Sequence, residues 1–384
     1  MKLDWTAPRW SGELTDCSMP MTFDTYSVCS YNCLYCFAFF QKSHFVNGYM
    51  DKSVRAVDPK KVKFLFENCL QNNSGPLSKA QRQFLPYIKG RYTMQWGSMA
   101  DGFDEFERRE GISLELLKIF HELDYPLSIS TKGTWFTKDP RYMNLIAKHR
   151  HNWHFKISII TSDPIKAKFL ERGVDSPAER FEAIKRLSSL GVSVTLRLRP
   201  YMIGISDDWR KTLIEGRKSG ADSITTEFFC LEARADEKLK RKYIEISKIA
   251  GYDVWNFYRD NSLNKSGYRR LQYAIKRPII DEMKKTAHAL NMRFYVSDAH
   301  CKEQSDFCCC CGVPPDRKVS KGHFAEALLL AKKTGIVYWK DIAHTLKSLV
   351  GDIPYASAVN FNTGSNLSRC AHLNQSLYDY VHEL

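Results

Sequence analysis

The sequence has no long apolar run and no low-complexity segment. No stretch approaches the roughly 18 uncharged apolar residues that a membrane-spanning helix needs. The opening residues, MKLDWTAPRWSGEL, contain no apolar signal core. Internal repeats are also missing, which argues against a repeat array. These features predict a globular cytoplasmic protein without a membrane partner.

Cysteine is abundant but unevenly placed. The chain has 384 residues and 12 cysteines, and without a secretory signal a disulfide framework is not expected. Clustered thiols in a reducing compartment more often hold metal or carry out redox chemistry. Three cysteines lie within residues 29–36 and five within residues 301–311. The other four are interpreted as small buried or surface residues: Cys17, Cys69, Cys230 and Cys370.

The chain is strongly basic. Its formal net charge is +14, with 43% hydrophobic and 13% aromatic residues. This composition can bury a large core, so disorder is excluded. The positive charge either serves solubility or indicates a polyanionic partner such as nucleic acid.

Residues 20–230 alternate between strand and helix patterns. Strands are predicted at 22–28, 91–99, 126–133, 154–161, 192–200 and 221–229. Helices between them are predicted at 58–72, 113–124, 139–150, 176–191 and 207–220. Such alternation predicts an α/β fold whose parallel sheet is covered by helices. After residue 231 the pattern becomes mostly helical.

Polar and charged residues follow the predicted strands. Active sites of parallel sheets lie beyond the carboxyl ends of the strands. The residues expected at that rim, besides the first cysteines, are Ser98, Asp101, Ser130, Lys132, Ser158, Arg197 and Arg199. Thiols beside cations suit a metal cofactor and an anionic or zwitterionic ligand. Arg197 and Arg199 lie on one face of their strand, where one could instead form a structural ion pair.

The first cysteine motif is SVCSYNCLYC, residues 27–36. Cys29, Cys33 and Cys36 supply three soft ligands from one loop, which suit an iron–sulfur cluster, zinc or copper(I). A structural zinc site needs a fourth ligand, and His44 is the nearest candidate. Three cysteines on a four-iron cluster instead leave one iron open to the amino and carboxylate groups of a cofactor.

This spacing resembles the signature of the radical S-adenosylmethionine (SAM) superfamily. The segments GSMADGFDEFER, STKG and RLRPYMIGISDD resemble its spore photoproduct lyase-like branch. The resemblance implies a partial (β/α)6 radical-SAM barrel over residues 20–232. It also implies a [4Fe–4S] cluster on Cys29, Cys33 and Cys36, S-adenosyl-L-methionine as cofactor, and an electron donor such as flavodoxin or ferredoxin.

The resemblance also assigns cofactor contacts. Tyr35 would lie against the adenine, and Lys132, after Thr131, would bind the cofactor carboxylate. Ser98 and Asp101 would contact the methionine amine, and Arg197 and Arg199 would lie near the cofactor. Ser130 and Ser158 are added to the cofactor site because they lie at strand ends. The sequence departs from the family at Met202, where a proline-rich turn is usual, and at Gly97-Ser98-Met99, which only loosely matches the usual Gly-Gly-Glu element.

The second cysteine cluster lies in HCKEQSDFCCCCGVPP, residues 300–315. Consecutive residues of an extended chain alternate in direction, so four adjacent cysteines cannot all face one metal. We expect an auxiliary iron–sulfur cluster on Cys301, Cys308, Cys310 and Cys311. A structural zinc site and metal-free redox thiols remain alternatives. His300 could be a further ligand or a surface histidine.

The sequence therefore predicts four regions: an N-terminal extension (1–19), the barrel (20–232), a cysteine-bearing extension (233–320) and a helical C-terminal region (321–384). The predicted function is radical SAM chemistry that removes hydrogen from a nucleic acid or nucleotide. The basic, tyrosine-containing segment SGYRRLQYAIKR suits such a partner, or forms an ordinary helix with Leu271 and Ile275 in the core. Alternatives are a peptide or small-metabolite substrate, and a non-catalytic iron–sulfur redox sensor bound to nucleic acid.

Overall fold

The computed structural model describes residues 1–11, 18–19, 21–38, 54–233, 237–262, 268–298, 301, 304–307 and 309–319. The predicted ligand Cys308, the candidates His44 and His300, and the predicted C-terminal region 321–384 lie outside the described residues.

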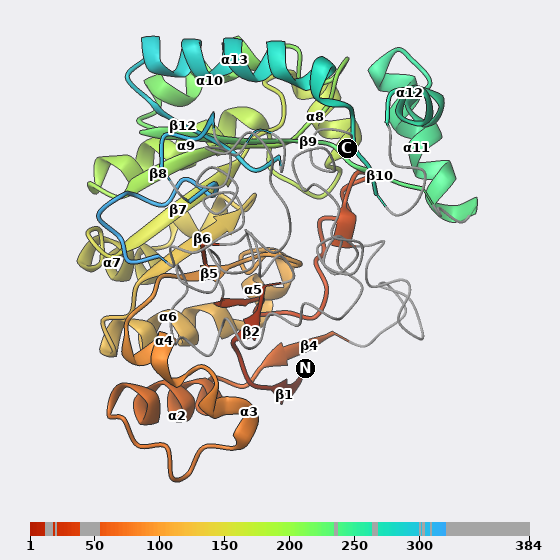
Figure 1. Ribbon diagram of the computed structural model, residues 1–384. Helices are drawn as coiled ribbons and strands as arrows, with labels where there is room; N and C mark the ends of the chain where they lie inside the picture. The colour runs from red at the N-terminus through yellow and green to blue at the C-terminus, as the bar shows by residue number, and fades with distance from the viewer. Residues whose placement is uncertain are drawn as a thin grey trace, which may run out of the picture.

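An eight-stranded sheet forms the centre of the protein, with the order β12-β9-β8-β7-β6-β5-β3-β2 (Figure 1). Neighbouring strands are parallel except β2 and β3, which are antiparallel. The strands are β2 (Arg9–Trp10), β3 (Met21–Phe23), β5 (Met94–Trp96), β6 (Leu127–Thr131), β7 (Trp153–Ser158), β8 (Ser193–Tyr201), β9 (Ser223–Phe228) and β12 (Arg293–Val296). Two small sheets pair β1 (Lys2–Trp5) with β4 (Arg55–Val57), and β10 (Leu231–Glu232) with β11 (Tyr268–Arg269).

Helices connect the parallel strands and lie outside the sheet (Figure 1). They are α2 (Pro59–Leu70), α3 (Lys79–Arg82), α4 (Leu85–Lys89), α5 (Glu105–Glu110), α6 (Ile112–Glu122), η1 (Trp135–Lys138), α7 (Pro140–Lys148), α8 (Pro164–Leu170), α9 (Pro177–Ser189), α10 (Trp209–Lys218), α11 (Glu237–Ala250), α12 (Val254–Asp260) and α13 (Tyr273–Ala289). The predicted helices 58–72 and 139–150 both begin with Asp-Pro: Asp58 and Asp139 accept backbone hydrogen bonds at the first turns of α2 and α7.

The two faces of the sheet differ in polarity. On the outer face, Leu196 of β8 is so close to Gly216 of α10 that a Cβ at Gly216 would collide with it. The opposite face is polar: the hydroxyl of Thr195 lies 2.8 Å from His154 Nε2 and 2.7 Å from the hydroxyl of Ser223. Apolar side chains thus face the helices, and polar side chains line the interior of the partial barrel.

The second cysteine segment covers this polar inner face. Thr225 Oγ1 donates to the Cys310 carbonyl at 2.6 Å, and Thr195 Oγ1 donates to the Gly312 carbonyl at 3.1 Å. Gly312 has a φ of +77°, and a Cβ there would collide with the Thr195 side chain. Glycine is therefore required where this segment approaches the sheet.

The predicted α/β partial barrel is confirmed, and each of its six predicted strands is present. The sequence did not predict that β12 would pair with β9 and extend the sheet. In the segment that follows Tyr268, Leu271 is fully buried, Ile275 is partly buried against the core, and Lys276 forms a buried ion pair with Asp298 at 3.0 Å. Within the described ranges, no helix is both long and apolar enough to span a bilayer.

Candidate active site

The first cysteine loop follows β3 and is fixed by its backbone. Ser30 N donates to the Asp104 carboxylate at 2.7 Å, and Leu34 N donates to the Leu170 carbonyl at 2.9 Å. Asp104 also caps α5 by accepting from Phe106 N at 3.0 Å. Backbone contacts therefore hold this loop, and none of Cys29, Cys33 and Cys36 forms a disulfide.

Burial governs the electrostatics of these thiols. It raises the pKa of Cys29 well above its usual value and that of Cys33 to about 12, and Lys132 opposes the shift at Cys33. Protonated thiols release their protons when they bind metal. Among the described residues, no three Cys, His, Asp or Glu side chains converge on a single metal ion. A four-iron cluster binds each cysteine at a different iron, so separated thiols on one ordered loop fit such a cluster.

Lys132 lies against Tyr35, which is part of this loop. The Lys132 ammonium is 5.7 Å from the centre of the Tyr35 ring. The Tyr35 hydroxyl donates to Glu171, whose other carboxylate oxygen lies 2.7 Å from Arg180. Arg180 in turn donates to the Ser158 carbonyl at 2.8 Å. This buried chain fixes the Tyr35 ring and links the cysteine loop to the end of β7.

Glu171 and Arg180 were not predicted from the sequence. Both side chains are almost fully buried, although such residues usually lie at the surface. Arg180 lies in the amphipathic α9 pattern, where charged residues normally face solvent. No sequence signal distinguishes it from its exposed neighbours, because its burial depends on the tertiary position of Glu171.

Asp101 organises the end of β6. Its carboxylate accepts from Thr131 Oγ1 and Lys132 N, both at 2.7 Å, and from Phe103 N at 3.0 Å. Burial nevertheless raises the pKa of this carboxyl above its usual value. These contacts position Lys132, which makes Asp101 a positioning residue in this structure. Its predicted contact with the methionine amine stays a prediction.

Ser98 belongs to a separate polar group after β5. Its hydroxyl accepts from Arg9 at 2.7 Å, and Arg9 also pairs with Asp24 at 2.8 Å. Asp24 accepts the backbone N–H groups of residues 98, 99 and 100 at 2.7, 2.7 and 3.0 Å. Asp24 and Arg9 therefore hold the turn Gly97-Ser98-Met99, which only loosely matches the Gly-Gly-Glu element of the family. Neither Asp24 nor Arg9 was predicted as a site residue.

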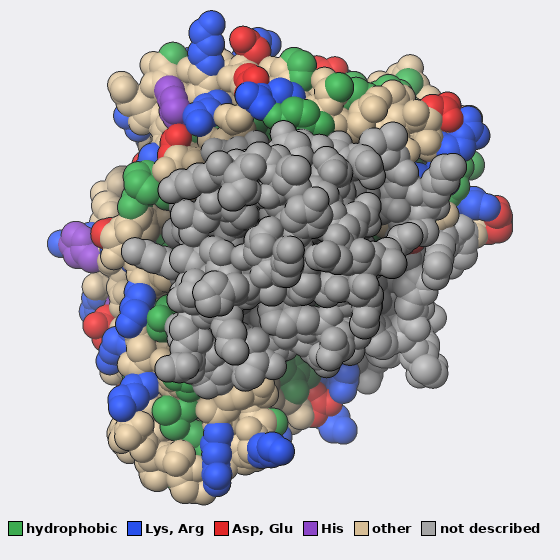
Figure 2. Space-filling model, viewed as in Figure 1, with side chains coloured by type: hydrophobic (Ala, Val, Ile, Leu, Met, Phe, Trp, Pro, Cys, Tyr) green, Lys and Arg blue, Asp and Glu red, His purple; other side chains and the backbone are tan. Residues whose placement is uncertain are grey.

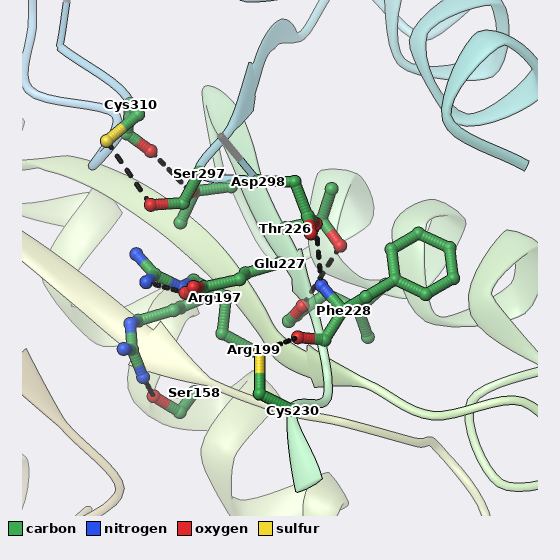
Figure 3. A network of polar contacts seen from close by, with 12 residues as sticks. Ser158, Arg197, Arg199, Thr226, Glu227, Phe228, Cys230, Ser297, Asp298 and Cys310 are labelled. Carbon is green, nitrogen blue, oxygen red and sulfur yellow. Dashed lines mark hydrogen bonds and ion pairs between the residues drawn. The ribbon is translucent and has the colours of Figure 1, made fainter. Parts of the chain in front are cut away.

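The two arginines of β8 have different partners (Figure 3). Arg199 pairs with Glu227 of β9, so the structural ion pair considered from the sequence falls on this residue. Arg197 donates to the Ser158 hydroxyl at 3.3 Å. Burial, followed by repulsion from Arg199, lowers the pKa of Arg197 to about 10. Arg197 and Ser158 thus lie together on the inner face, and Ser130 is buried on neighbouring β6.

A buried lysine faces the second cysteine segment. Lys156 of β7 is 1% exposed, and its ammonium has no hydrogen-bond partner in the described part of the chain. Burial lowers its pKa, while Cys311 and Cys309 act in the opposite direction. Lysine in such surroundings requires either a neutral amine or a nearby anion. Nothing in the sequence distinguishes Lys156 from the other residues of its strand pattern.

The second segment holds its thiols close together. Hydrogen bonds from Cys309 and Cys310 lower the pKa of Cys311 well below its usual value. The Cys310 sulfur also lies 3.3 Å from the Ser297 hydroxyl (Figure 3). Cys301 is fully buried and packs in the main core, whereas Cys309 and Cys311 pack with Met19. Cys309, which the sequence prediction omitted, therefore lies among the clustered thiols.

Comparisons with known proteins show the fold. No family model and no curated protein matches the sequence. Similar solved structures include a cysteine-to-serine mutant of spore photoproduct lyase, with a TM-score of 0.54 and 13% identity over 77% of this chain and 80% of that chain. Another is a double mutant of that lyase with bound AdoMet and dinucleoside spore photoproduct, with a TM-score of 0.53 and 15% identity over 75% of this chain and 80% of that chain.

Streptococcus suis SuiB bound to the precursor peptide SuiA is a more distant match, with a TM-score of 0.43 and 13% identity over 73% of this chain and 49% of that chain. At these identities the likeness concerns the fold and not the activity. This chain has the fold of spore photoproduct lyase.

Proposed function

We propose that this protein is a radical SAM enzyme. The observation that carries the proposal is the contact between the Lys132 ammonium and the Tyr35 ring. Tyr35 belongs to the loop that bears Cys29 and Cys33. When bound, a [4Fe–4S] cluster on Cys29, Cys33 and Cys36 supplies the electron that cleaves S-adenosylmethionine to methionine and a 5′-deoxyadenosyl radical. Flavodoxin or ferredoxin would be a suitable electron donor.

The residues around the loop would bind and orient the cofactor. The Lys132 ammonium would pair with the cofactor carboxylate, and Asp101 holds its backbone in place. Glu171 fixes the Tyr35 ring for stacking on adenine. Ser98, Ser130, Ser158, Arg197 and Arg199 are proposed as the remaining contacts. Among the described residues, the Arg197 guanidinium donates to Ser158 at 3.3 Å, so other N–H groups of this side chain could donate to the cofactor.

Incubating the reduced, reconstituted protein with S-adenosylmethionine alone tests this function. An enzyme with a cofactor pocket forms 5′-deoxyadenosine slowly even without substrate. A non-catalytic redox sensor, the alternative from another functional class, forms none. No detectable 5′-deoxyadenosine from protein with a full complement of iron would contradict the proposal.

For the substrate, we propose a nucleic acid or nucleotide. The net charge of +14 supports this class, and a similar lyase structure contains a dinucleoside. On the face shown in Figure 2, Lys and Arg side chains are spread along the described margin among Asp and Glu. The charge argument for this substrate class therefore depends mainly on long-range attraction between the positively charged protein and a polyanion.

Binding measured at several salt concentrations tests this substrate class. Neutralised phosphates release counterions, so affinity for a short oligonucleotide should fall steeply between about 50 and 200 mM salt. Flat salt dependence, or no binding at low salt, would favour the peptide or small-metabolite alternative.

We further propose an auxiliary iron–sulfur cluster on Cys301, Cys308, Cys310 and Cys311. The clustering of the Cys310 and Cys311 thiols on the inner face supports it, and Lys156 would offer a counter-charge. We also propose a cytoplasmic location and a division of the chain into four regions, 1–19, 20–232, 233–320 and 321–384. Anaerobic reconstitution should give about eight irons per chain. Zinc with only about four irons would instead support a structural metal site.

A further inference from the structure

A pocket lies at the opposite end of the barrel from the cysteine loop. Its volume is about 410 Å³, and residues that precede β5, β6 and β7 line it together with residues 316–318. Strand β7 has six residues, and at about 3.3 Å per residue it spans roughly 20 Å. A ligand in this pocket would therefore not touch the proposed cofactor site. We call it the amino-end pocket.

Cations dominate the amino-end pocket. Its wall contains Arg91, Lys148, Arg317 and Lys318, together with His149 and His151. The two carboxylates in the wall already have partners. Asp124 lies 3.3 Å from His149 and accepts from Asn152 at 3.1 Å, and Asp316 pairs with Arg317 at 2.6 Å. The lysines thus keep a positive charge that these carboxylates do not neutralise.

The wall is held in place by the surrounding structure. Arg91 donates to the carbonyls of Leu123 and Asp124 at 3.0 and 2.8 Å. The Lys318 carbonyl accepts from Thr93 N at 2.8 Å, and the Lys318 ammonium lies 4.8 Å from the Tyr92 ring centre. Arg317 Nε is buried and has no hydrogen-bond partner in the described ranges. The Arg317 side chain is thus enclosed in the wall, and its guanidinium pairs with Asp316.

We propose that the amino-end pocket binds clustered phosphates, as carried by a free nucleotide or by a polynucleotide backbone. Its volume falls within the range of about 300–1,000 Å³ that is typical of small-ligand sites. Phosphate oxygens accept charge-assisted hydrogen bonds from Arg and Lys. Arg91, held by two carbonyls, and the exposed Lys148 and Lys318 provide such donors. The site is separate from the radical chemistry and extends beyond the proposed function.

The test compares two charge-reversal variants of the reconstituted protein. The pocket variant carries Lys148→Glu and Lys318→Glu, and both lysines are exposed. The control carries Lys211→Glu on α10 and Lys285→Glu on α13, which are also exposed and outside the pocket. The probes are pyrophosphate, ATP and a short single-stranded oligonucleotide at low salt. Both variants have the same net charge, so a difference between them reports on the pocket itself.

We expect the pocket variant to lose at least about tenfold in affinity for one or more phosphate probes, while the control changes by less than about threefold. Selective loss of ATP and pyrophosphate binding would identify a free nucleotide, and selective loss of oligonucleotide binding would identify a polynucleotide. Equal weakening in both variants, or no binding of any probe to the parent protein, would overturn the proposal. Formation of 5′-deoxyadenosine should be unchanged, so this result is independent of the proposed function.

Discussion

The two cysteine-rich segments of this protein are built differently. In residues 29–36 the backbone is tied to Asp104 and Leu170, and the thiols are spread along an ordered loop at the strand ends. In residues 309–312 the backbone is tied to Thr195 and Thr225 on the inner face of the sheet, and neighbouring thiols hydrogen-bond to one another. The first arrangement presents thiols as separate ligands, whereas the second brings neighbouring thiols into contact with one another.

Their surroundings differ as well. The first loop is flanked by Asp101 and Asp104, which together with burial raise the pKa of Cys29. The second segment faces Lys156 and Arg199, which help to lower the pKa of Cys311. Within the second segment the shifts run in opposite directions, because the hydrogen bond with Cys311 raises the pKa of Cys309 well above its usual value. The two segments thus differ in which charges lie nearest: carboxylates flank Cys29, whereas cations face Cys311.

The largest expected effect that separates the two segments comes from replacing the four cysteines 308–311 with Ala. Because the first site is independent, this variant should keep about four irons and still form 5′-deoxyadenosine slowly. It should lose product formation if the second centre holds substrate or passes electrons. Iron content and product analysis check this, and a variant with full iron content would show that the second segment holds no cluster.

Lys132→Ala should weaken the first site without affecting the second. A charge-assisted contact contributes about 1.5–3 kcal/mol, so affinity for S-adenosylmethionine should fall roughly ten- to a hundredfold. Equilibrium binding to the reconstituted protein measures this, with Lys211→Ala as an exposed control. Affinity within twofold of the parent would place the cofactor carboxylate elsewhere.

Lys156→Met should act on the second segment in two opposite ways. Replacing a buried, unpaired ammonium with an apolar side chain of similar length should stabilise the metal-free protein by up to about 1–4 kcal/mol. The same change removes a counter-charge and should lower iron retention at the second site. Urea unfolding and iron analysis measure the two effects. Lower stability of the metal-free variant would mean that Lys156 already has an anionic partner.

The smallest effect concerns His154, beneath the second segment. Burial holds its pKa well below 6.5, whereas in the unfolded chain it titrates near about 6.5. As the pH falls below this value the unfolded state binds the extra proton, so stability falls by up to about 1.4 kcal/mol per pH unit. His154→Gln should flatten this slope between pH 7.5 and 5.5 in urea unfolding. Identical slopes in both proteins would show that folding does not lower the pKa of His154.

The sequence predicted the parts of the structure that depend on local patterns. Alternating strand and helix patterns, with helix starts such as Asp58-Pro59, predicted the partial barrel. The position of Lys132 at a strand end predicted that it would lie near the cysteine loop, where it contacts Tyr35. It could not predict contacts between distant segments. The burial of Arg180 against Glu171, and the packing of the second cysteine segment against Thr195, depend on tertiary positions that leave no periodic signal.

The most direct test of the account is the triple variant Cys29→Ala, Cys33→Ala and Cys36→Ala, reconstituted anaerobically beside the parent protein. Iron content and 5′-deoxyadenosine are measured after reduction in the presence of S-adenosylmethionine. We predict that the variant loses about four irons, keeps those of the second site, and forms no 5′-deoxyadenosine. Cofactor cleavage at the parent rate would contradict the assignment of the radical-generating cluster to this loop.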